Sequence, residues 1–151
     1  MNVNIEEIPS CKIVYMRQIG PYGIANSQLM DKFKCWVQSN SVTNSLSVIL
    51  GIAHDNPAWV KPENCRYDAC LVVPEDYCVH SDEVSVRNIS GGSYAVFKIP
   101  HTAEAVQKAW DDIFMEVKRR GFSLDETRPI LERYTVELIN RHYCEICVPV
   151  H

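Results

Sequence analysis

Hydrophobic and polar positions follow two different rhythms along this chain. Where apolar residues recur at every second position or form a short unbroken run, the pattern predicts a β-strand. In the first half the expected strands are 2–8, 11–19, 47–53 and 66–73. Between the second and the third of them, Leu29, Phe33 and Val37 recur at helical spacing, which predicts a helix from about residue 25 to 38.

The second half repeats this order of elements. Its expected strands are 83–89, 94–99, 128–134 and 143–150. A helix should begin after Thr102, a good N-cap residue, and end at Gly121, with the basic run 118–120 in its last turn. The polar stretch 39–47 and the proline-containing stretch 54–64 predict loops.

The two halves also match residue by residue at an offset of 80 or 81; for example, Leu29-Met30-Asp31 corresponds to Ala109-Trp110-Asp111. We interpret residues 1–151 as one domain made of two fused copies, about 1–76 and 77–151. The expected fold is α+β: each copy has one helix and several antiparallel strands, so two helices should pack on one face of an antiparallel sheet, related by a pseudo-twofold axis. The groove between the helices is the expected place for a ligand pocket.

Glu132 corresponds to Gly51 at an offset of 81, so one half supplies a carboxylate where the other has none. A directional binding site would show this asymmetry, and so would sequence drift between the copies. Glu132 lies in the middle of an apolar and aromatic strand, and strand alternation places Ile130 and Tyr134 on its face. A carboxylate on such a wall either has a raised pKa or awaits a positive partner. We interpret Glu132 as the polar anchor of a small-molecule pocket; the alternative is a surface residue on an edge strand.

Aromatic residues can complete the wall around Glu132. The candidates for ligand binding, besides Glu132 and Tyr134, are Tyr22, Trp36, Tyr67, Trp110, Phe114 and Tyr143. A box of aromatic rings with one carboxylate suits flat or cationic organic molecules, since each cation–π contact contributes about 0.5–2 kcal/mol. For each of these aromatic residues, ordinary packing in the core is the alternative interpretation.

Charge and composition narrow the function classes. The formal net charge is −4 and the pI is about 5.7, which argues against direct binding of nucleic acid through phosphate contacts. No apolar run approaches the roughly 18 residues that span a bilayer, and the N-terminus lacks the features of a signal peptide. We therefore expect a cytoplasmic protein with no membrane partner.

The seven cysteines do not indicate a metal or redox site. Cys144 and Cys147 form a lone Cys-x-x-Cys, but on a strand this spacing places the two thiols on opposite faces. Free thiols in a reducing compartment fit best, and neither a metal nor a cofactor is expected. The five histidines are scattered, and most of them are expected at the surface.

Several short motifs resemble those of one known family. They are Ile19-Gly20-Pro21-Tyr22, His54-Asp55-Asn56-Pro57, Arg66-Tyr67-Asp68-Ala69, the stretch from Ile89 to Phe97, Glu132-x-Tyr134 and Cys147-Val148-Pro149-Val150. Their order along the whole chain resembles the GyrI-like small-molecule-binding domain. The resemblance implies a tandem duplicated β-α-β-β unit and a pocket between the helices, with Glu132 as its carboxylate and Tyr134 as the partner of that carboxylate. It also implies that Asp68 is structural and serves strand pairing rather than chemistry. The same family supplies the effector-binding half of AraC-type and MerR-type multidrug-sensing regulators, and it also occurs alone, as in the gyrase inhibitor protein.

The chain departs from the family pattern in three respects. Ile99-Pro100-His101 stands where many members repeat a Gly-Pro-Tyr turn, so one rim of the pocket is expected to differ. Lys34 and Cys35 stand in the first helix where bulkier apolar residues are common. No DNA-binding domain is expected beside the 151 residues of this sequence.

Three functions are compatible with this interpretation. The first is a protein that binds amphipathic, often cationic, small molecules, either to sense them or to sequester them in drug or toxin resistance. The second is a hydrolase of cyclopropane-containing genotoxins, an activity that some stand-alone members of the family resemble. In this role Glu132 would activate water and Tyr134 would donate a proton. The third is an inhibitor of DNA gyrase. The sequence favours binding and leaves open whether the protein is an enzyme.

Overall fold

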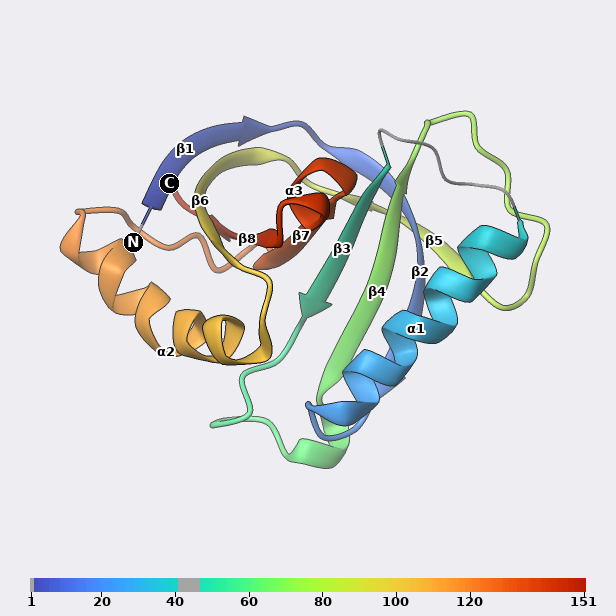
Figure 1. Cartoon of the computed structure of the whole chain (residues 1–151), viewed down its shortest axis with the longest axis horizontal. Coiled ribbons are helices and arrows are strands. Elements are labelled where there is room, and N and C mark those ends of the chain that lie inside the picture. The colour runs from blue at the N-terminus through green and yellow to red at the C-terminus, as the bar shows by residue number, and fades with distance from the viewer. Residues whose placement is uncertain (1, 41–46) are drawn as a thin grey trace.

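The computed structural model describes residues 2–40 and 47–151; positions 41–46 of the predicted loop 39–47 lie outside the described residues. The described chain forms one eight-stranded antiparallel sheet with helices packed against it (Figure 1). The strands are β1 (Asn2–Ile8), β2 (Cys11–Ile19), β3 (Val48–Ala53), β4 (Arg66–Val73), β5 (Ser85–Ile89), β6 (Gly92–Pro100), β7 (Leu131–Thr135) and β8 (Tyr143–Pro149). The helices are α1 (Ile24–Ser39), α2 (Ala103–Arg119), the short α3 (Val136–Asn140) and the 3-10 turn η1 (Pro62–Asn64).

The strand order confirms the duplicated, pseudo-twofold α+β architecture. The sheet runs β1-β6-β8-β7-β3-β4-β2-β5. The counterparts in the two halves are β1 and β5, β2 and β6, β3 and β7, and β4 and β8. When each strand is exchanged for its counterpart, the same strand order results, read in the opposite direction. The two halves of the chain interlock, because each edge strand pairs with a strand from the other half of the chain: β1 pairs with β6, and β5 pairs with β2.

The central pair, β3 and β7, lies at the pseudo-axis. In its register Val48 faces Thr135, and Gly51 faces Glu132. Gly51 and Glu132 are also the residues that correspond at the repeat offset of 81. In an antiparallel pair related by a twofold axis, equivalent residues face each other only at the axis. The Glu132 carboxylate, whose counterpart is a glycine, therefore lies at the centre of the sheet.

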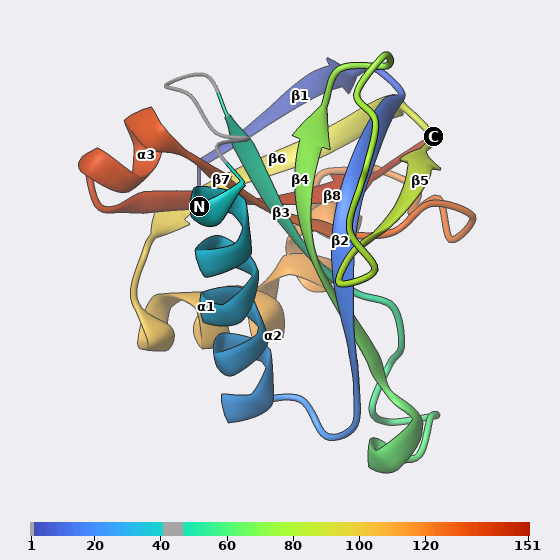
Figure 2. The ribbon, with the colours of Figure 1, turned by 90° about the vertical axis from the view of Figure 1, so that its right-hand side faces the viewer.

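Both long helices cover the same face of the sheet (Figures 1 and 2). Helix α1 buries Phe33, Trp36 and Val37 in a cluster with residues of β2 and β4. Helix α2 buries Ala109, Ile113 and Val117 in a cluster with residues of β6 and β8. The opposite face carries a third cluster, to which both halves contribute: Ile13, Leu50, Ile52, Cys70, Ile89, Tyr94, Val96, Leu131 and Cys147. Each helix thus covers its own half, and the centre of the helix-bearing face stays open.

The alternation predicted for the last strand is confirmed, because Cys144 packs in the cluster under α2 and Cys147 in the cluster on the other face. Two details differ from the prediction. Strand β7 begins at Leu131 rather than 128, because Pro129 has no N–H to donate and Arg128 uses its side chain to bind the carbonyl oxygens of Ser93 and Val150. Helix α3 was not predicted.

The start of α3 follows from a local cap. The Thr135 hydroxyl accepts a hydrogen bond from the Leu138 N–H and so caps the helix immediately after β7. With only five residues, the helix gives no recognisable period in the sequence. Among the described residues, no helix is long and apolar enough to cross a membrane.

Candidate functional site

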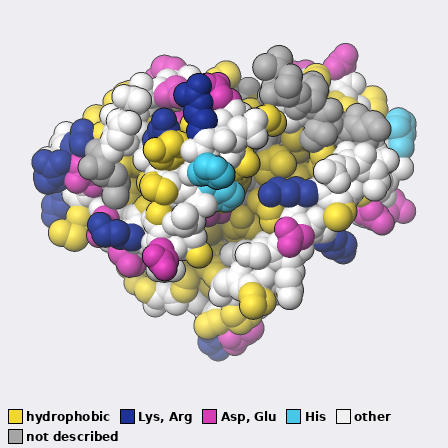
Figure 3. Space-filling view, in the orientation of Figure 1, with side chains coloured by type: hydrophobic (Ala, Val, Ile, Leu, Met, Phe, Trp, Pro, Cys, Tyr) yellow, Lys and Arg dark blue, Asp and Glu magenta, His cyan; other side chains and the backbone are white. Residues whose placement is uncertain are grey.

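A cavity of about 1340 Å³ lies between the two helices, above the centre of the sheet. Both halves of the chain line it, from Met30 and Lys34 on α1 to Val106 and Trp110 on α2. The face that bears the helices is hollowed at this place, with hydrophobic side chains in its depth (Figure 3). The groove expected between the helices is therefore present, and it is large enough for an organic molecule of drug size.

Glu132 stands on the floor of this cavity. The Tyr67 hydroxyl, from β4, donates a hydrogen bond of 3.0 Å to Oε1 of Glu132. The bond passes over Gly51, where a Cβ atom would overlap with both the Tyr67 hydroxyl and Oε1. The absence of a side chain at Gly51 therefore makes room for the carboxylate and its partner. The correspondence of Glu132 with a glycine in the other half is thus explained by the space that the Glu132 side chain occupies.

The pKa of Glu132 is raised above its ordinary value because protein atoms remove most of its water. Hydrogen-bonding groups of Tyr67, Trp110 and Tyr134 act against this shift. Burial, together with the neighbouring carboxylate, raises the pKa of Tyr67 and of Tyr134, so both hydroxyls keep their protons and can donate. Among the described residues, no lysine, arginine or histidine pairs with Glu132. The cavity thus contains a carboxylate that has hydrogen-bond donors but no counter-ion.

Four of the other aromatic candidates line this cavity, namely Tyr22, Tyr67, Trp110 and Phe114, in addition to Tyr134. Phe114 is 45% exposed, so its ring is available on the helix flank. The Tyr22 hydroxyl accepts a hydrogen bond from the Asp55 N–H and donates one to the Arg66 carbonyl. It thereby fixes the start of α1 against the 54–66 loop.

Two aromatic candidates lie elsewhere, and the prediction that they line the pocket is corrected here. Trp36 is buried in the core, where its ring stacks on Phe33 at 6.2 Å and its N–H reaches the Ser81 hydroxyl. Tyr143 is 36% exposed, and the Lys98 ammonium lies 4.4 Å from its ring centroid. Neither side chain borders the cavity.

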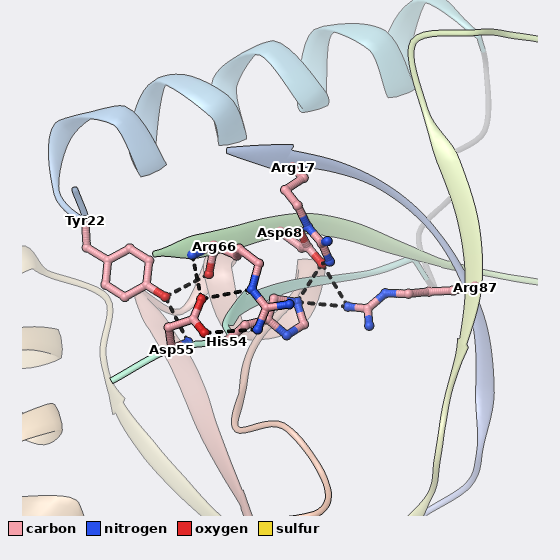
Figure 4. Close-up of polar contacts among 7 residues, drawn as sticks. All are labelled: Arg17, Tyr22, His54, Asp55, Arg66, Asp68 and Arg87. Atoms are coloured by element: carbon pink, nitrogen blue, oxygen red, sulfur yellow. Dashed lines mark hydrogen bonds and ion pairs between the residues drawn. The ribbon is translucent and has the colours of Figure 1, made fainter. Parts of the chain in front are cut away.

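A second polar cluster surrounds Asp68, whose side chain is completely buried (Figure 4). Arg17 donates to it at 2.8 and 3.0 Å, Arg87 at 2.8 Å, and His54 Nε2 lies 2.7 Å away. Burial alone would raise the pKa of Asp68, but the bonds from His54 and Arg17 lower it to about 2. The prediction that Asp68 serves only strand pairing therefore understates its role, because it joins β2, β4, β5 and the loop that starts at His54.

His54 is the exception among the histidines, four of which are exposed as expected, because its side chain is only 13% exposed. Its neighbour Asp55 binds Arg66 through two side-chain bonds of 3.0 Å. These bonds hold the loop after β3 beside the cavity, which Asp55, Asn56 and Trp59 also line. Within the described chain, no three His, Cys, Asp or Glu side chains cluster closely enough to hold a metal ion.

Gly51→Ala should lower the stability of the fold. The added methyl group must displace Tyr67, Glu132 or both, and such overpacking costs about 1–3 kcal/mol. Urea denaturation measures the stability loss. The same substitution made in a Glu132→Ala background should cost less, because one of the two crowded groups is then gone. An equal loss in both backgrounds would contradict this account of Gly51.

Comparison with known proteins agrees with the geometry. A family model described as the GyrI-like small molecule binding domain matches residues 1–151. The chain is 43% identical over 151 residues to YosT of Bacillus subtilis (strain 168), a prophage-derived protein named as a candidate transcriptional regulator, with 99% of each chain covered. It is 30% identical over 148 residues to a protein named DNA gyrase inhibitor from Cronobacter turicensis, with 97% of this chain and 93% of the relative covered.

Solved structures share the fold at low sequence identity. The C-terminal domain of EcmrR gives a TM-score of 0.75 at 18% identity, covering 99% of this chain and 97% of that domain. In the EcmrR–DNA complex the match spans only 57% of the EcmrR chain. SAV2435, solved bound to tetraphenylphosphonium, gives a TM-score of 0.63 at 16% identity, with 100% and 94% covered. From the family model, the relatives and the duplicated architecture together, the chain belongs to the family of GyrI-like small-molecule-binding domains.

Proposed function

We propose that this protein binds lipophilic organic cations in the cavity between α1 and α2, with Glu132 as the counter-ion. One observation carries the proposal: the Glu132 carboxylate lies in an aromatic cavity, and no cationic residue of the described chain pairs with it. A buried charge without a partner is unfavourable. A bound cation would supply the missing partner, and the fold would keep the site ready for it.

The aromatic lining suits the rest of such a ligand. Tyr67, Trp110 and Tyr134 approach the carboxylate from three elements, and Phe114 extends the wall along α2. Stacking and cation–π contacts with these rings contribute about 0.5–2 kcal/mol each, and they place few demands on ligand shape. A delocalised cation fits better than an ammonium ion, because the donors around Glu132 already occupy part of its hydrogen-bonding capacity.

The comparisons support a role in sensing or sequestration. SAV2435 was solved with tetraphenylphosphonium, a lipophilic cation, and EcmrR was solved in complex with DNA. Carried over to this chain, ligand binding would either remove toxic cations from solution or change the activity of a separate regulator.

Titration calorimetry with tetraphenylphosphonium tests the proposal. Methyltriphenylphosphonium and uncharged triphenylphosphine oxide serve as the matched pair, because both carry three phenyl rings and only the first is positively charged. We expect micromolar binding of the cation and at least about tenfold weaker binding of the oxide, a difference of about 1.4 kcal/mol. Equal affinities would contradict the role given to Glu132.

Affinity for the cation should increase with pH. Only ionised Glu132 attracts a cation, and its pKa is raised above the ordinary value of 4.5. Below that raised pKa, each unit of acidification should weaken binding by up to about tenfold, because more of the carboxyl is protonated. Above it, affinity should level off. Glu132→Gln should remove this pH dependence. If the affinity of the wild type stays constant through the acid range, Glu132 is not the counter-ion.

Inhibition of DNA gyrase is a second candidate, favoured by the names of relatives that match most of the chain. In this role gyrase would be a protein partner, consistent with the formal net charge of −4, which does not favour direct DNA binding. A supercoiling assay decides the point. Loss of supercoiling at micromolar protein would support it, and full supercoiling at that concentration would remove it.

A further inference from the structure

Two basic residues lie near each other at the rim of the cavity. Lys34 comes from α1, and His101 directly precedes Thr102, the N-cap of α2; both line the cavity. The rim therefore receives one basic residue from each half of the chain. These are the two places where the sequence departs most clearly from the family motifs.

The rim lies close to the carboxylate on the floor. The ring of His101 is tilted against Tyr134, with 5.5 Å between ring centroids. Tyr134 in turn directs a hydrogen-bonding group to Glu132. Burial lowers the pKa of His101, and the nearby charge of Lys34 lowers it further, so the imidazole is neutral at neutral pH and can still donate one N–H.

Neither rim group has an acidic partner within the described chain. Asp55 and Asp125 also line the cavity, but they pair with Arg66 and Arg128. Asp31 lies one turn before Lys34 on α1, and no ion pair joins the two. The floor of the cavity thus presents a carboxylate without a cationic partner, and its rim presents the Lys34 ammonium without an ion pair to the exposed carboxylates of Asp31 and Glu126 that also line it.

From this arrangement we infer that the preferred ligand is an amphipathic zwitterion, an aromatic cation that also carries a carboxylate or a similar anionic group. The inference rests on the proposed function and sharpens it. The cationic part would lie against Glu132 and the aromatic wall, and the anionic group would accept hydrogen bonds from Lys34 and His101. A ligand that is only cationic would lie below an unpaired ammonium, which repels it.

A matched pair of compounds tests this inference. A butanoate that carries triphenylphosphonium at its far end is a zwitterion, and the corresponding primary butanamide has the same shape with the cation alone. We expect the wild type to bind the butanoate about fivefold more tightly, the effect of one partly solvated ion pair. In Lys34→Met the butanoate should bind no more tightly than the butanamide, with butanamide affinity kept or slightly increased. Lys32→Met, on the same exposed helix but away from this cavity, should retain the wild-type preference.

The possible results separate the two proposals. If the butanamide binds and the butanoate binds equally or more weakly in the wild type, the zwitterion inference is wrong and the cation site stands. A preference that survives in Lys34→Met would also overturn it, because the anionic group would then bind elsewhere. If neither compound binds, the cation site fails and the inference fails with it. Both lysines are exposed, so unfolding of the variants is not expected, and thermal denaturation checks this.

Discussion

Glu132→Gln should weaken the binding of tetraphenylphosphonium by about 100-fold, or about 2.7 kcal/mol, the range found when one member of a buried charged pair is removed. Glutamine has nearly the same shape and can still accept the hydrogen bond from Tyr67, so the cavity should keep its form. Only the negative charge is lost. Titration calorimetry of the two proteins at neutral pH measures the difference.

The same variant should be at least as stable as the wild type when no ligand is present. Burial raises the pKa of Glu132, so ionised Glu132 is unfavourable in the empty cavity at neutral pH and glutamine removes this penalty. Glu126→Gln is the matched control, because Glu126 lines the same cavity and is exposed. Its affinity should change less than about threefold. A large loss of affinity in Glu126→Gln, or none in Glu132→Gln, would show that Glu132 is not the counter-ion.

Glu132→Gln also separates binding from hydrolysis. If the protein hydrolyses an electrophilic cyclopropane, the variant should lose turnover, because the amide cannot act as a general base on water. The binding account predicts no turnover in either protein.

The second large effect concerns stability. Asp68→Asn should destabilise the fold by about 3 kcal/mol, because it leaves Arg17 and Arg87 without the buried carboxylate that joins them. Urea denaturation provides the measurement. Asp112→Asn is the control, since its ion pair with Lys108 lies at the surface and should contribute less than about 1 kcal/mol.

The pH dependence of this loss follows from the pKa of Asp68. The pKa falls from the ordinary 3.8 to about 2 in the folded protein, so ionised Asp68 stabilises the fold fully above the unfolded pKa. The stabilisation is lost as the pH falls through the folded pKa. The gap between the wild type and Asp68→Asn should therefore be constant near neutral pH and shrink between about pH 4 and 2. A gap that is the same at low and neutral pH would rule out an ionic role for Asp68.

The architecture could be predicted because its signals are local or repeated. The spacing of Phe33 and Val37, the cap at Thr102 and the stop at Gly121 each fix one element without reference to the rest of the chain. The offset of 81 then relates the halves and pairs Gly51 with Glu132. The sequence did not predict that Gly51 lies directly opposite Glu132 across β3 and β7. The register between distant strands is set by tertiary packing.

The site could be predicted only in part, for a related reason. Trp36 and Trp110 both lie on amphipathic helices, but the sequence does not say which edge of the apolar stripe faces the sheet and which faces the groove. Trp36 faces the core, and Trp110 faces the cavity. Likewise, nothing local to Asp68 indicates Arg17, His54 and Arg87, which come from three other segments. Contacts of this kind appear only when the strands are placed.

The duplication explains why one site serves the whole domain. Two equal halves would place either two carboxylates or none at the pseudo-axis. With glycine at 51 and glutamate at 132, the single charge has the space of both positions. A second carboxylate there would raise the pKa of the first and weaken its attraction for a cation.

A crystal structure of the protein with tetraphenylphosphonium tests the central claim most directly. The account predicts that the phosphonium lies between α1 and α2, with Glu132 as the nearest acidic group and its rings against Tyr67, Trp110 and Tyr134. Electron density for the cation outside this cavity, or within it but closer to another carboxylate than to Glu132, would contradict the account.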